Sequence, residues 1–213
     1  MPKTMPESTP SHSHLTLKLV LLIVGLYLID QVTKLLIVWK FDAPSYQGIL
    51  GQPETHRYVV DTVPVIDNFL NIVRIHNTGV AFGMGNGTAW SSYVFLAVPV
   101  LACAILIYMF RKGFFSTTVL RVAWALLIAG ILGNLTDRLI QGFIYNAQYA
   151  HSQLKFAACI LSGYVVDFID VTIPFINYRW PAFNIADSCI CIAAALFIIS
   201  SFKSSSGQQE VAQ

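Results

Sequence analysis

Two aspartates lie in short motifs where a polar segment meets a long apolar one. Asp167 occurs in Gly-Tyr-Val-Val-Asp-Phe-Ile-Asp, and Asp187 occurs in Pro-Ala-Phe-Asn-Ile-Ala-Asp-Ser, at the start of an apolar stretch. An ionised carboxylate inside hydrocarbon costs about 3 kcal/mol on insertion scales, so such residues indicate function. Two adjacent carboxylates share a proton, and their pKa values separate. The pair predicts acid–base hydrolysis, in which one carboxylate activates water and the other stabilises an oxyanion.

Polar residues that could hold a substrate share helical faces near these aspartates. Asn134 and Arg138 are four residues apart, and Asn184 and Asp187 are three apart. Taken singly, Asn184 or Asp187 could simply cap a helix, and Arg138 could be an interfacial anchor. An arginine with an amide in the preceding turn can instead donate hydrogen bonds to carbonyl groups of a bound peptide.

A second group of polar residues is predicted to support the site. Asp30 and Lys34 are four residues apart in the first apolar stretch, so they can neutralise each other across one helical turn. A structural role for this pair is favoured over direct chemistry. Gly133 leaves room for a neighbouring helix, and Asp137 lies in the same motif. Asp170 is interpreted as a solvated residue.

The composition indicates an integral membrane protein. Of 213 residues, 55% are hydrophobic and 11% are charged, and the mean hydropathy of +0.63 lies above the usual soluble range. The net charge of +2 and the scattered basic residues exclude a nucleic-acid partner. The four cysteines and five histidines lack metal-ligand spacing, so neither a metal nor a cofactor is expected.

Four apolar stretches approach the length of about 20 residues that a membrane-spanning helix needs. The sequence therefore predicts a mainly α-helical membrane protein with four transmembrane helices. These helices are expected at about 19–39, 90–110, 119–139 and 183–202.

Lysine and arginine residues concentrate at one end of these spans, which predicts that both termini face the cytoplasm. The long connections then lie on the outer side, with a small β-cradle at about 41–89 and an insertion at about 142–162. Residues 15–203 are expected to form one domain, and the polar tails 1–14 and 204–213 are expected to be disordered.

The outer-side segment 41–89 combines strand and turn signals. Runs of β-branched and apolar residues at 58–66 and 69–75 predict strands. The following Gly-rich stretch, which includes Gly79 and Gly83, either allows a close backbone approach to the site or is an ordinary turn.

Five motifs, in order along the chain, resemble those of lipoprotein signal peptidase (signal peptidase II), a family of four-span bacterial aspartyl peptidases. They cover most of the chain from the first span to the fourth. The motifs are Asp30-Gln-Val-Thr-Lys34, Asn77-Thr-Gly-Val-Ala-Phe-Gly83, Gly133-Asn-Leu-Thr-Asp-Arg138, Val165-Val-Asp-Phe-Ile169 and Phe183-Asn-Ile-Ala-Asp-Ser188.

The resemblance implies that Asp167 and Asp187 form a catalytic dyad. It also implies that the substrate is a prolipoprotein carrying a diacylglyceryl-cysteine, cleaved just before that cysteine, and that globomycin-type inhibitors occupy the dyad. The expected location is the bacterial cytoplasmic (inner) membrane, with the dyad near the outer, periplasmic face. Membrane lipid is a further expected partner of the protein. The residues expected to contact the substrate are Asn77, Asn134, Arg138 and Asn184.

The chain departs from the family pattern in the insertion at 142–162 and in an extended stretch at 41–61. Neither departure interrupts a motif. The alternative function is a small proton-coupled transporter, because intramembrane carboxylates also form proton relays. The absence of a visible inverted repeat disfavours that alternative.

Overall fold

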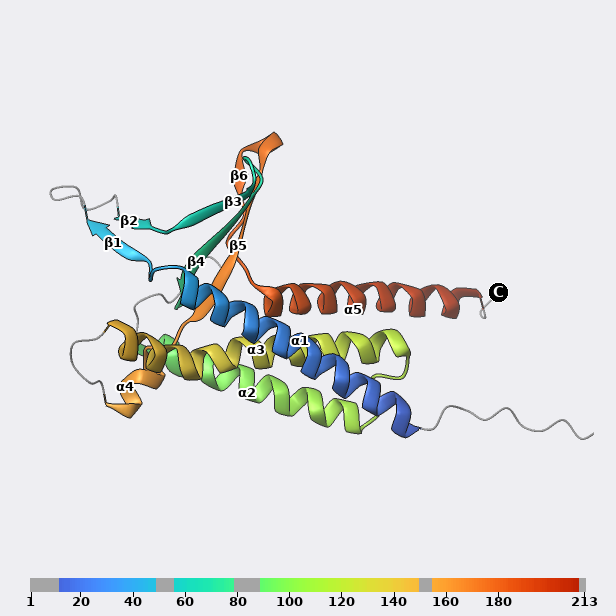
Figure 1. Cartoon of the computed structure of the whole chain (residues 1–213). Helices are drawn as coiled ribbons and strands as arrows, with labels where there is room; N and C mark the ends of the chain where they lie inside the picture. Colours follow the sequence, from blue (N-terminus) through green and yellow to red (C-terminus); the bar gives the residue numbers. More distant parts are fainter. Residues whose placement is uncertain (1–11, 49–55, 79–88, 150–154, 211–213) are drawn as a thin grey trace, which may run out of the picture.

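The computed structural model describes residues 12–48, 56–78, 89–149 and 155–210. Within these ranges, long helices form a bundle, and a small antiparallel sheet projects from one end of it (Figure 1). The predicted support residues Gly79 and Gly83 lie outside the described residues, as do the ends of both predicted tails.

Within the described ranges, four helices are long and apolar enough to cross a membrane, which confirms the predicted fold class. Helix α5 continues to Glu210, beyond the predicted end of the fourth span and into the stretch predicted as a disordered tail. The helices are α1 (His12–Lys40), α2 (Ala89–Arg111), α3 (Thr118–Tyr149) and α5 (Ile185–Glu210).

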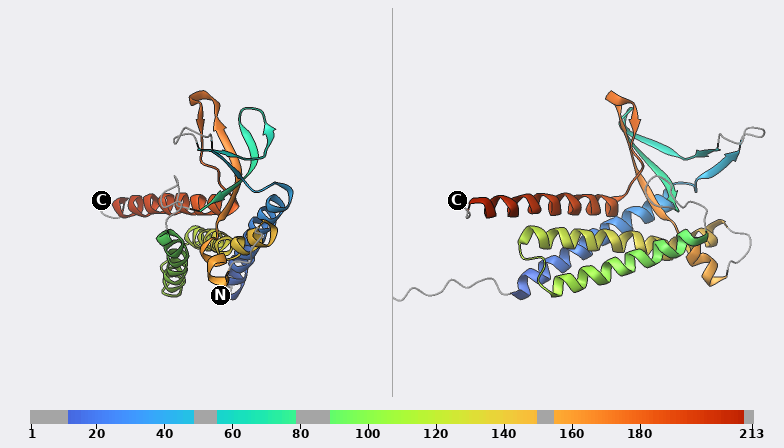
Figure 2. Two further views of the ribbon diagram at one scale, coloured as in Figure 1. Left: turned by 90° about the vertical axis from the view of Figure 1, so that its left-hand side faces the viewer. Right: turned by 180° about the vertical axis from the view of Figure 1, so that it is seen from behind.

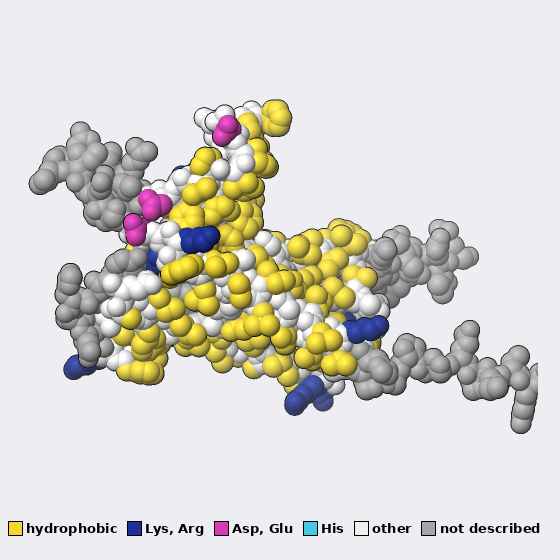
Figure 3. Space-filling view, in the orientation of Figure 1, with side chains coloured by type: hydrophobic (Ala, Val, Ile, Leu, Met, Phe, Trp, Pro, Cys, Tyr) yellow, Lys and Arg dark blue, Asp and Glu magenta, His cyan; other side chains and the backbone are white. Residues whose placement is uncertain are grey.

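The sheet and the ends of the described chain occupy opposite ends of the bundle. Figures 1 and 2 show α1 beginning and α5 ending at the end remote from the sheet. The turn between α2 and α3 also lies at that remote end. In Figure 3, hydrophobic side chains cover the visible flank of the bundle, as expected for helices that face lipid.

The predicted insertion is partly helical. Helix α3 runs on to Tyr149, and the short helix α4 (Phe156–Leu161) packs back against it. Gly142 permits this close approach, because a side chain there would collide with the backbone of Cys159. The rings of Phe143 and Phe156, 5.2 Å apart, also join the two helices.

Among the described residues, two small sheets lie at the end of the bundle remote from the turn between α2 and α3. The pair β1 (Ser45–Gly48) and β2 (His56–Val59) is antiparallel. The larger sheet is antiparallel in the order β3-β4-β5-β6. Its strands are β3 (Thr62–Ile66), β4 (Leu70–Asn77), β5 (Val165–Ile173) and β6 (Tyr178–Arg179).

Strand β4 confirms the strand predicted at 69–75. The run predicted at 58–66 is also extended, but it is divided between the end of β2 and strand β3, which belong to different sheets. Strand β5 was not predicted, because its run of apolar residues with two aspartates lacks a simple alternation of polar and apolar positions. Its burial explains the pattern, since the first four residues of β5 are all buried.

A β-bulge changes the pairing of β4 with β5 halfway along. Ile72 lies opposite Ile169, whereas Ile75 lies opposite Asp167. Strand β4 therefore has one extra residue between these two pairs. Both residues in the bulge, Val73 and Arg74, are completely buried.

Helices α1, α3 and α5 approach closely around one glycine. A side chain at Gly133 of α3 would lie 2.6 Å from Oδ2 of Asp30 on α1 and 3.0 Å from Cβ of Ala186 on α5. The small residue anticipated from the sequence therefore sits where three helices meet.

We predict that Gly133→Ala lowers the free energy of unfolding by about 1–3 kcal/mol, because overpacking displaces Asp30 and Ala186. Thermal unfolding in detergent micelles measures the effect. The control is Gly25→Ala in α1, where an added Cβ meets no atom within 4 Å, so the stability should be unchanged or higher. Equal stability of the two variants would contradict the packing argument.

Candidate active site

Asp167 lies near the start of β5 and is only 2% exposed. Its Oδ1 accepts a hydrogen bond of 2.7 Å from Nδ2 of Asn184, and its Oδ2 accepts one of 2.9 Å from Nδ2 of Asn77. Asn77 ends β4, so the adjacent strand supplies one donor and the start of α5 supplies the other. Both carboxylate oxygens are therefore fixed in direction.

Asp187 lies in the first turn of α5, where backbone N–H groups favour a negative charge. Its Oδ2 accepts from the backbone N–H of Asn184 at 3.2 Å, and its own N–H donates to Oδ1 of Asn184 at 2.9 Å. This reciprocal pair is a capping box that closes the helix start. The helix-capping role considered for Asn184 and Asp187 is confirmed, and it orients the carboxylate of Asp187.

Asn184 joins the two aspartates. Its side-chain amide donates to Asp167 while its backbone and carbonyl oxygen bind Asp187. Asn184 is fully buried, so these contacts replace water at its polar atoms. The fold thus brings together two carboxylates from a strand and a helix through one shared residue.

Asn134 on α3 provides a further donor to Asp187, with Nδ2 at 2.8 Å from Oδ1. The carbonyl oxygen of the same amide accepts from Nζ of Lys34 at 3.0 Å and from Nδ2 of Asn184 at 3.2 Å. Because an ammonium group only donates, Lys34 determines which way the Asn134 amide points. The lysine therefore acts on the site through this amide.

Lys34 forms ion pairs with two aspartates. Its Nζ lies 2.9 Å from Oδ2 of Asp30 and 3.1 Å from Oδ2 of Asp137. The predicted Asp30–Lys34 pair is confirmed, and Asp137 joins it as a second partner. All three side chains are buried, so each charge depends on the others for its neutralisation.

The same aspartates also bind backbone groups of the elements that carry the two site carboxylates. Oδ1 of Asp30 accepts from the N–H of Ala186 at 2.9 Å, and Oδ2 of Asp137 accepts from the N–H of Val166 at 3.0 Å. Ala186 and Val166 each immediately precede a site aspartate in the chain. The buried ion cluster thus fixes the start of α5 and the start of β5.

Two other sequence interpretations are revised or extended. Asp170 is not solvated: it is 1% exposed and pairs with Nε of Arg179 at 2.6 Å, and it also accepts from Nδ2 of Asn71 at 3.1 Å. This hydrogen-bonded pairing raises the pKa of Arg179. Arg138 is partly buried, with its guanidinium carbon 4.5 Å from the centre of the Phe95 ring on α2.

The pKa of Asp167 is raised from 3.8 to about 7. Burial is the largest cause, and the negative charge of Asp187 adds to it. The hydrogen bonds from Asn77 and Asn184 and the charge of Lys34 act in the opposite direction. Asp167 can therefore carry a proton near neutral pH.

A buried cluster behind Asp167 was not anticipated from the sequence. Nε of Arg74 donates to Nε2 of His76 at 3.1 Å, and the His76 ring stacks on Tyr164 with 3.7 Å between ring centres. Burial, with a contribution from Arg74, lowers the pKa of His76 to about 3, and burial raises the pKa of Tyr164. The only available signal was an arginine three residues before Asn77, the first residue of a predicted site motif.

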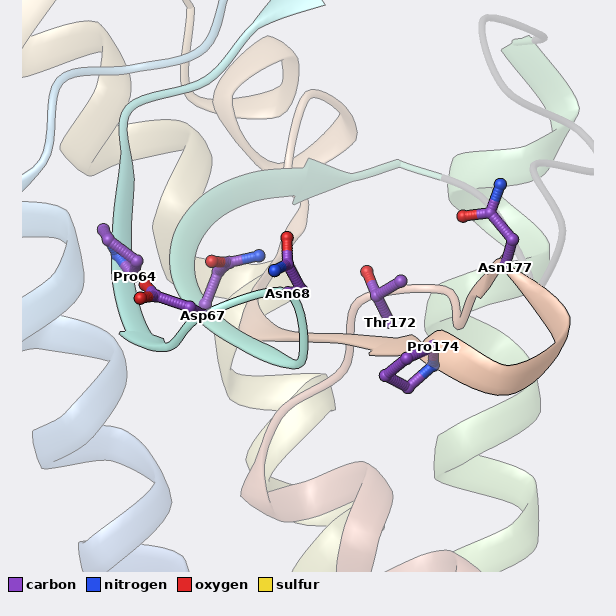
Figure 4. A pocket seen from close by; sticks show the side chains of 7 residues that line it. Pro64, Asp67, Asn68, Thr172, Pro174 and Asn177 are labelled. Carbon is purple, nitrogen blue, oxygen red and sulfur yellow. The ribbon is translucent and has the colours of Figure 1, made fainter.

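One open hollow lies away from this site. It has a volume of about 670 Å³ and occupies the turns at the far end of the larger sheet (Figure 4). None of the sequence-predicted site residues lines it, so we assign it no part in the chemistry. Its lining residues are Pro64, Asp67, Asn68, Asn71, Thr172, Pro174 and Asn177.

Comparison with known proteins decides the family. The family model described as signal peptidase (SPase) II matches residues 22–203. The chain belongs to this family. Residues 22–203 include all five sequence motifs and every predicted site residue.

Curated relatives named lipoprotein signal peptidase support the same assignment. The chain is 34% identical to that of Alteromonas mediterranea over 158 residues, which cover 71% of this chain and 74% of the relative. It is 36% identical to the relative from Thermodesulfovibrio yellowstonii over 180 residues, which cover 83% of this chain and 88% of the relative.

Solved structures of bacterial membrane enzymes share the fold. One, determined by the in meso method at 2.3 Å, aligns with a TM-score of 0.66 and 30% identity, covering 89% of this chain and 90% of that chain. A second structure, determined by the same method at 1.9 Å, aligns with a TM-score of 0.62 and 31% identity. This alignment covers 87% of this chain and 93% of that chain.

As a signal peptidase II, the protein is a multi-pass membrane peptidase that removes signal peptides from lipoproteins. Its substrates are prolipoproteins. No observation on the described residues favours the transporter alternative over this assignment.

The depressed pKa of His76 predicts a loss of stability in acid. Below its ordinary value of 6.5, the unfolded chain binds a proton that the folded chain takes up only near 3. Stability is therefore lost as pH falls from 6.5 towards 3. His76→Gln keeps an acceptor for Arg74 without titrating, so its thermal midpoint should fall less than that of the wild type between about pH 7.5 and about pH 5. An equal fall in both proteins would refute this origin.

Proposed function

We propose that the protein is an aspartyl endopeptidase that uses Asp167 and Asp187 to cleave prolipoproteins immediately before the diacylglyceryl-cysteine. The observation that carries this proposal is the joint binding of both carboxylates by Asn184. The two carboxylates share this buried partner and lie at the mouth of an apolar helix, where the negative charge of Asp187 favours a proton on Asp167.

The surroundings of the two carboxylates support different roles. Asp167 is buried, and its raised pKa favours the protonated form, so it acts as the acid. Asp187 is partly exposed, and donors from Asn134 and the helix start stabilise its negative charge, so it acts as the base.

The reaction then proceeds without a covalent intermediate. Asp187 takes a proton from water, and the resulting hydroxide attacks the scissile carbonyl carbon. The proton of Asp167 neutralises the developing oxyanion. When the C–N bond breaks, the proton held by Asp187 passes to the leaving amine of the lipidated cysteine. As the intermediate collapses, one of its hydroxyl groups returns a proton to Asp167, which leaves a carboxylic acid, a free amine and the dyad in its starting state.

The four predicted substrate contacts divide into two groups. The amides of Asn77, Asn134 and Asn184 donate to the carboxylates, so we assign them mainly to orienting the dyad. Arg138 presents a guanidinium group on the same helix as Asn134, and we assign it to carbonyl groups of the signal peptide.

The position of the site in the bundle supports a proposed placement in the membrane. The site occupies the sheet end of the bundle, and the concentration of lysine and arginine predicts that this end is the outer one. The proposed location is the bacterial inner membrane with both termini in the cytoplasm. A substrate can then enter laterally with its acyl chains in lipid, and globomycin-type inhibitors would compete at the dyad.

Removing either carboxylate should abolish cleavage. We predict that Asp167→Asn and Asp187→Asn each lower the rate at least about 100-fold, because an amide can neither accept nor supply the proton. Cleavage of a purified diacylglyceryl-prolipoprotein in micelles measures this. The matched control is Asp67→Asn, which makes the same change at an exposed turn of the sheet and should retain activity. Full activity in either dyad variant, or loss of wild-type activity on metal chelation, would contradict the mechanism.

The acid role of Asp167 predicts that activity declines as pH rises through about 7, where this group loses its proton. The Asn77 amide stabilises the ionised form of Asp167. Asn77→Leu should therefore raise the pKa of Asp167 and move the alkaline limb of the kcat profile to higher pH. A limb that stays in place or moves to lower pH would contradict the assignment.

A further inference from the structure

Arg74 is a completely buried arginine outside the dyad. Its Nη1 donates to the carbonyl oxygens of Val38 at 3.1 Å and Phe41 at 2.8 Å, at the C-terminal end of α1. Its other nitrogens donate to His76 and to the Tyr164 hydroxyl. The guanidinium group thus bridges strand β4, helix α1 and the segment that leads into β5.

The charge of Arg74 is compensated mainly by the backbone. Among the described residues, no carboxylate forms an ion pair with it. The last carbonyl groups of a helix lack intrahelical partners and carry the negative end of the helix dipole. Val38 and Phe41 supply such groups, so Arg74 caps α1 from the neighbouring strand.

Arg74 lies in the β-bulge that changes the pairing of β4 with β5. Before the bulge, Ile72 pairs with Ile169, and after it, Ile75 pairs with Asp167 and Asn77 pairs with Val165. Residues that pair directly in a sheet project from the same face. Asn77 and Asp167 therefore share a face, as their hydrogen bond of 2.9 Å requires.

Without the bulge, the pairing of Ile72 with Ile169 would continue and would set Arg74 opposite Asp167. A shift of one residue moves every side chain to the opposite face of a strand. Asp167 would then share a face with Arg74 and His76, and Asn77 would project from the other side. The contact between Asn77 and Asp167 therefore depends on the bulge.

The neighbours of Arg74 hold the bulge from both sides. His76 is stacked on Tyr164, and Tyr145 from α3 meets both rings edge-on. Because Nε2 of His76 accepts from Arg74, the imidazole is neutral and its orientation is fixed. The α1 carbonyl groups anchor the other side of the guanidinium group.

We propose that Arg74 is a positioning residue for the peptidase reaction: by capping α1 from within the bulge, it sets the register in which Asn77 reaches Asp167. This inference rests on the proposed function of the dyad. Arg74 itself touches neither carboxylate in the structure, so its effect on the reaction passes through Asn77.

The test compares Arg74→Met with Asn77→Leu in the full-length protein, with cleavage of a diacylglyceryl-prolipoprotein in micelles as the assay. We expect Arg74→Met to lower kcat about tenfold or more with a smaller change in KM. It should also move the alkaline limb of the kcat profile to higher pH, as Asn77→Leu does. The double variant should be little worse than the worse single variant, because both changes remove the same contact.

Three comparisons isolate the role of Arg74. Arg179→Met makes the same substitution in the same sheet beyond the bulge and should leave the pH profile unchanged. Arg74→Lys keeps a cation near the α1 carbonyls without the planar fork, so we expect an intermediate kcat and a smaller shift of the profile. The other charged groups acting on Asp167, which are Asp187, Lys34 and Arg138, stay unchanged in all variants.

The outcomes separate the two proposals. If Asp167→Asn abolishes cleavage but Arg74→Met and Arg74→Lys keep the wild-type kcat and pH profile, the inference on Arg74 is wrong and the dyad stands. If Arg74→Met does not fold, Arg74→Lys decides by its pH profile. Additive effects of Arg74→Lys and Asn77→Leu would also overturn the inference, and full activity of Asp167→Asn would overturn the proposed function itself.

Discussion

The ammonium group of Lys34 is buried inside an apolar bundle, and its neutralisation organises the rest of the site. Two aspartates, one from its own helix and one from α3, lie within ion-pair distance. Leaving such a charge unpaired would cost about 3–5 kcal/mol, so helices α1 and α3 are held together at this level. The carboxylates of these two aspartates, Asp30 and Asp137, also accept hydrogen bonds from backbone N–H groups at the starts of α5 and β5. One electrostatic requirement thereby sets the positions of both elements that carry the dyad.

The side-chain amides of Asn134 and Asn184 determine the orientation of the two site carboxylates. An asparagine side chain has one accepting and one donating end, and a neighbouring ammonium group selects between them. Lys34 faces the carbonyl end of Asn134, which turns the donor towards Asp187. The backbone N–H and side-chain carbonyl of Asn184 bind Asp187 and cap α5. Its side-chain NH2 group donates to Asp167. Hydrogen bonds are stronger in a buried site than in water, so burial helps to keep these asparagine amides in one orientation.

The extramembrane sheet provides a second, independent support. The positive charge of Arg74 in this sheet is compensated by carbonyl groups at the end of α1. The positive charge of Lys34 in the bundle is compensated by carboxylates. The contacts of Arg74 couple the C-terminal end of α1 to strand β4. The Lys34 cluster couples the interior of α1 to α3 and α5. Asp167 therefore lies between two anchored regions, which suits the acid role that we propose for it.

The sequence by itself determined the four apolar spans, the extended segments around 58–66 and 69–75, and the motifs that contain the dyad. These features depend on hydropathy and short-range spacing, which are local properties of the chain. The Asp30–Lys34 ion pair was predictable for the same reason, since residues four apart on a helix are neighbours. Family resemblance added the roles that we propose for the paired aspartates.

Only the tertiary structure decided which distant groups meet. The burial of Asp170 against Arg179, strand β5, and the addition of Asp137 to the Lys34 cluster arise from contacts between elements that no local pattern encodes. The bulge at Arg74 is the clearest case. Whether Asn77 faces Asp167 or the opposite side depends on one inserted residue in a strand pair, and that register is fixed by packing against α1.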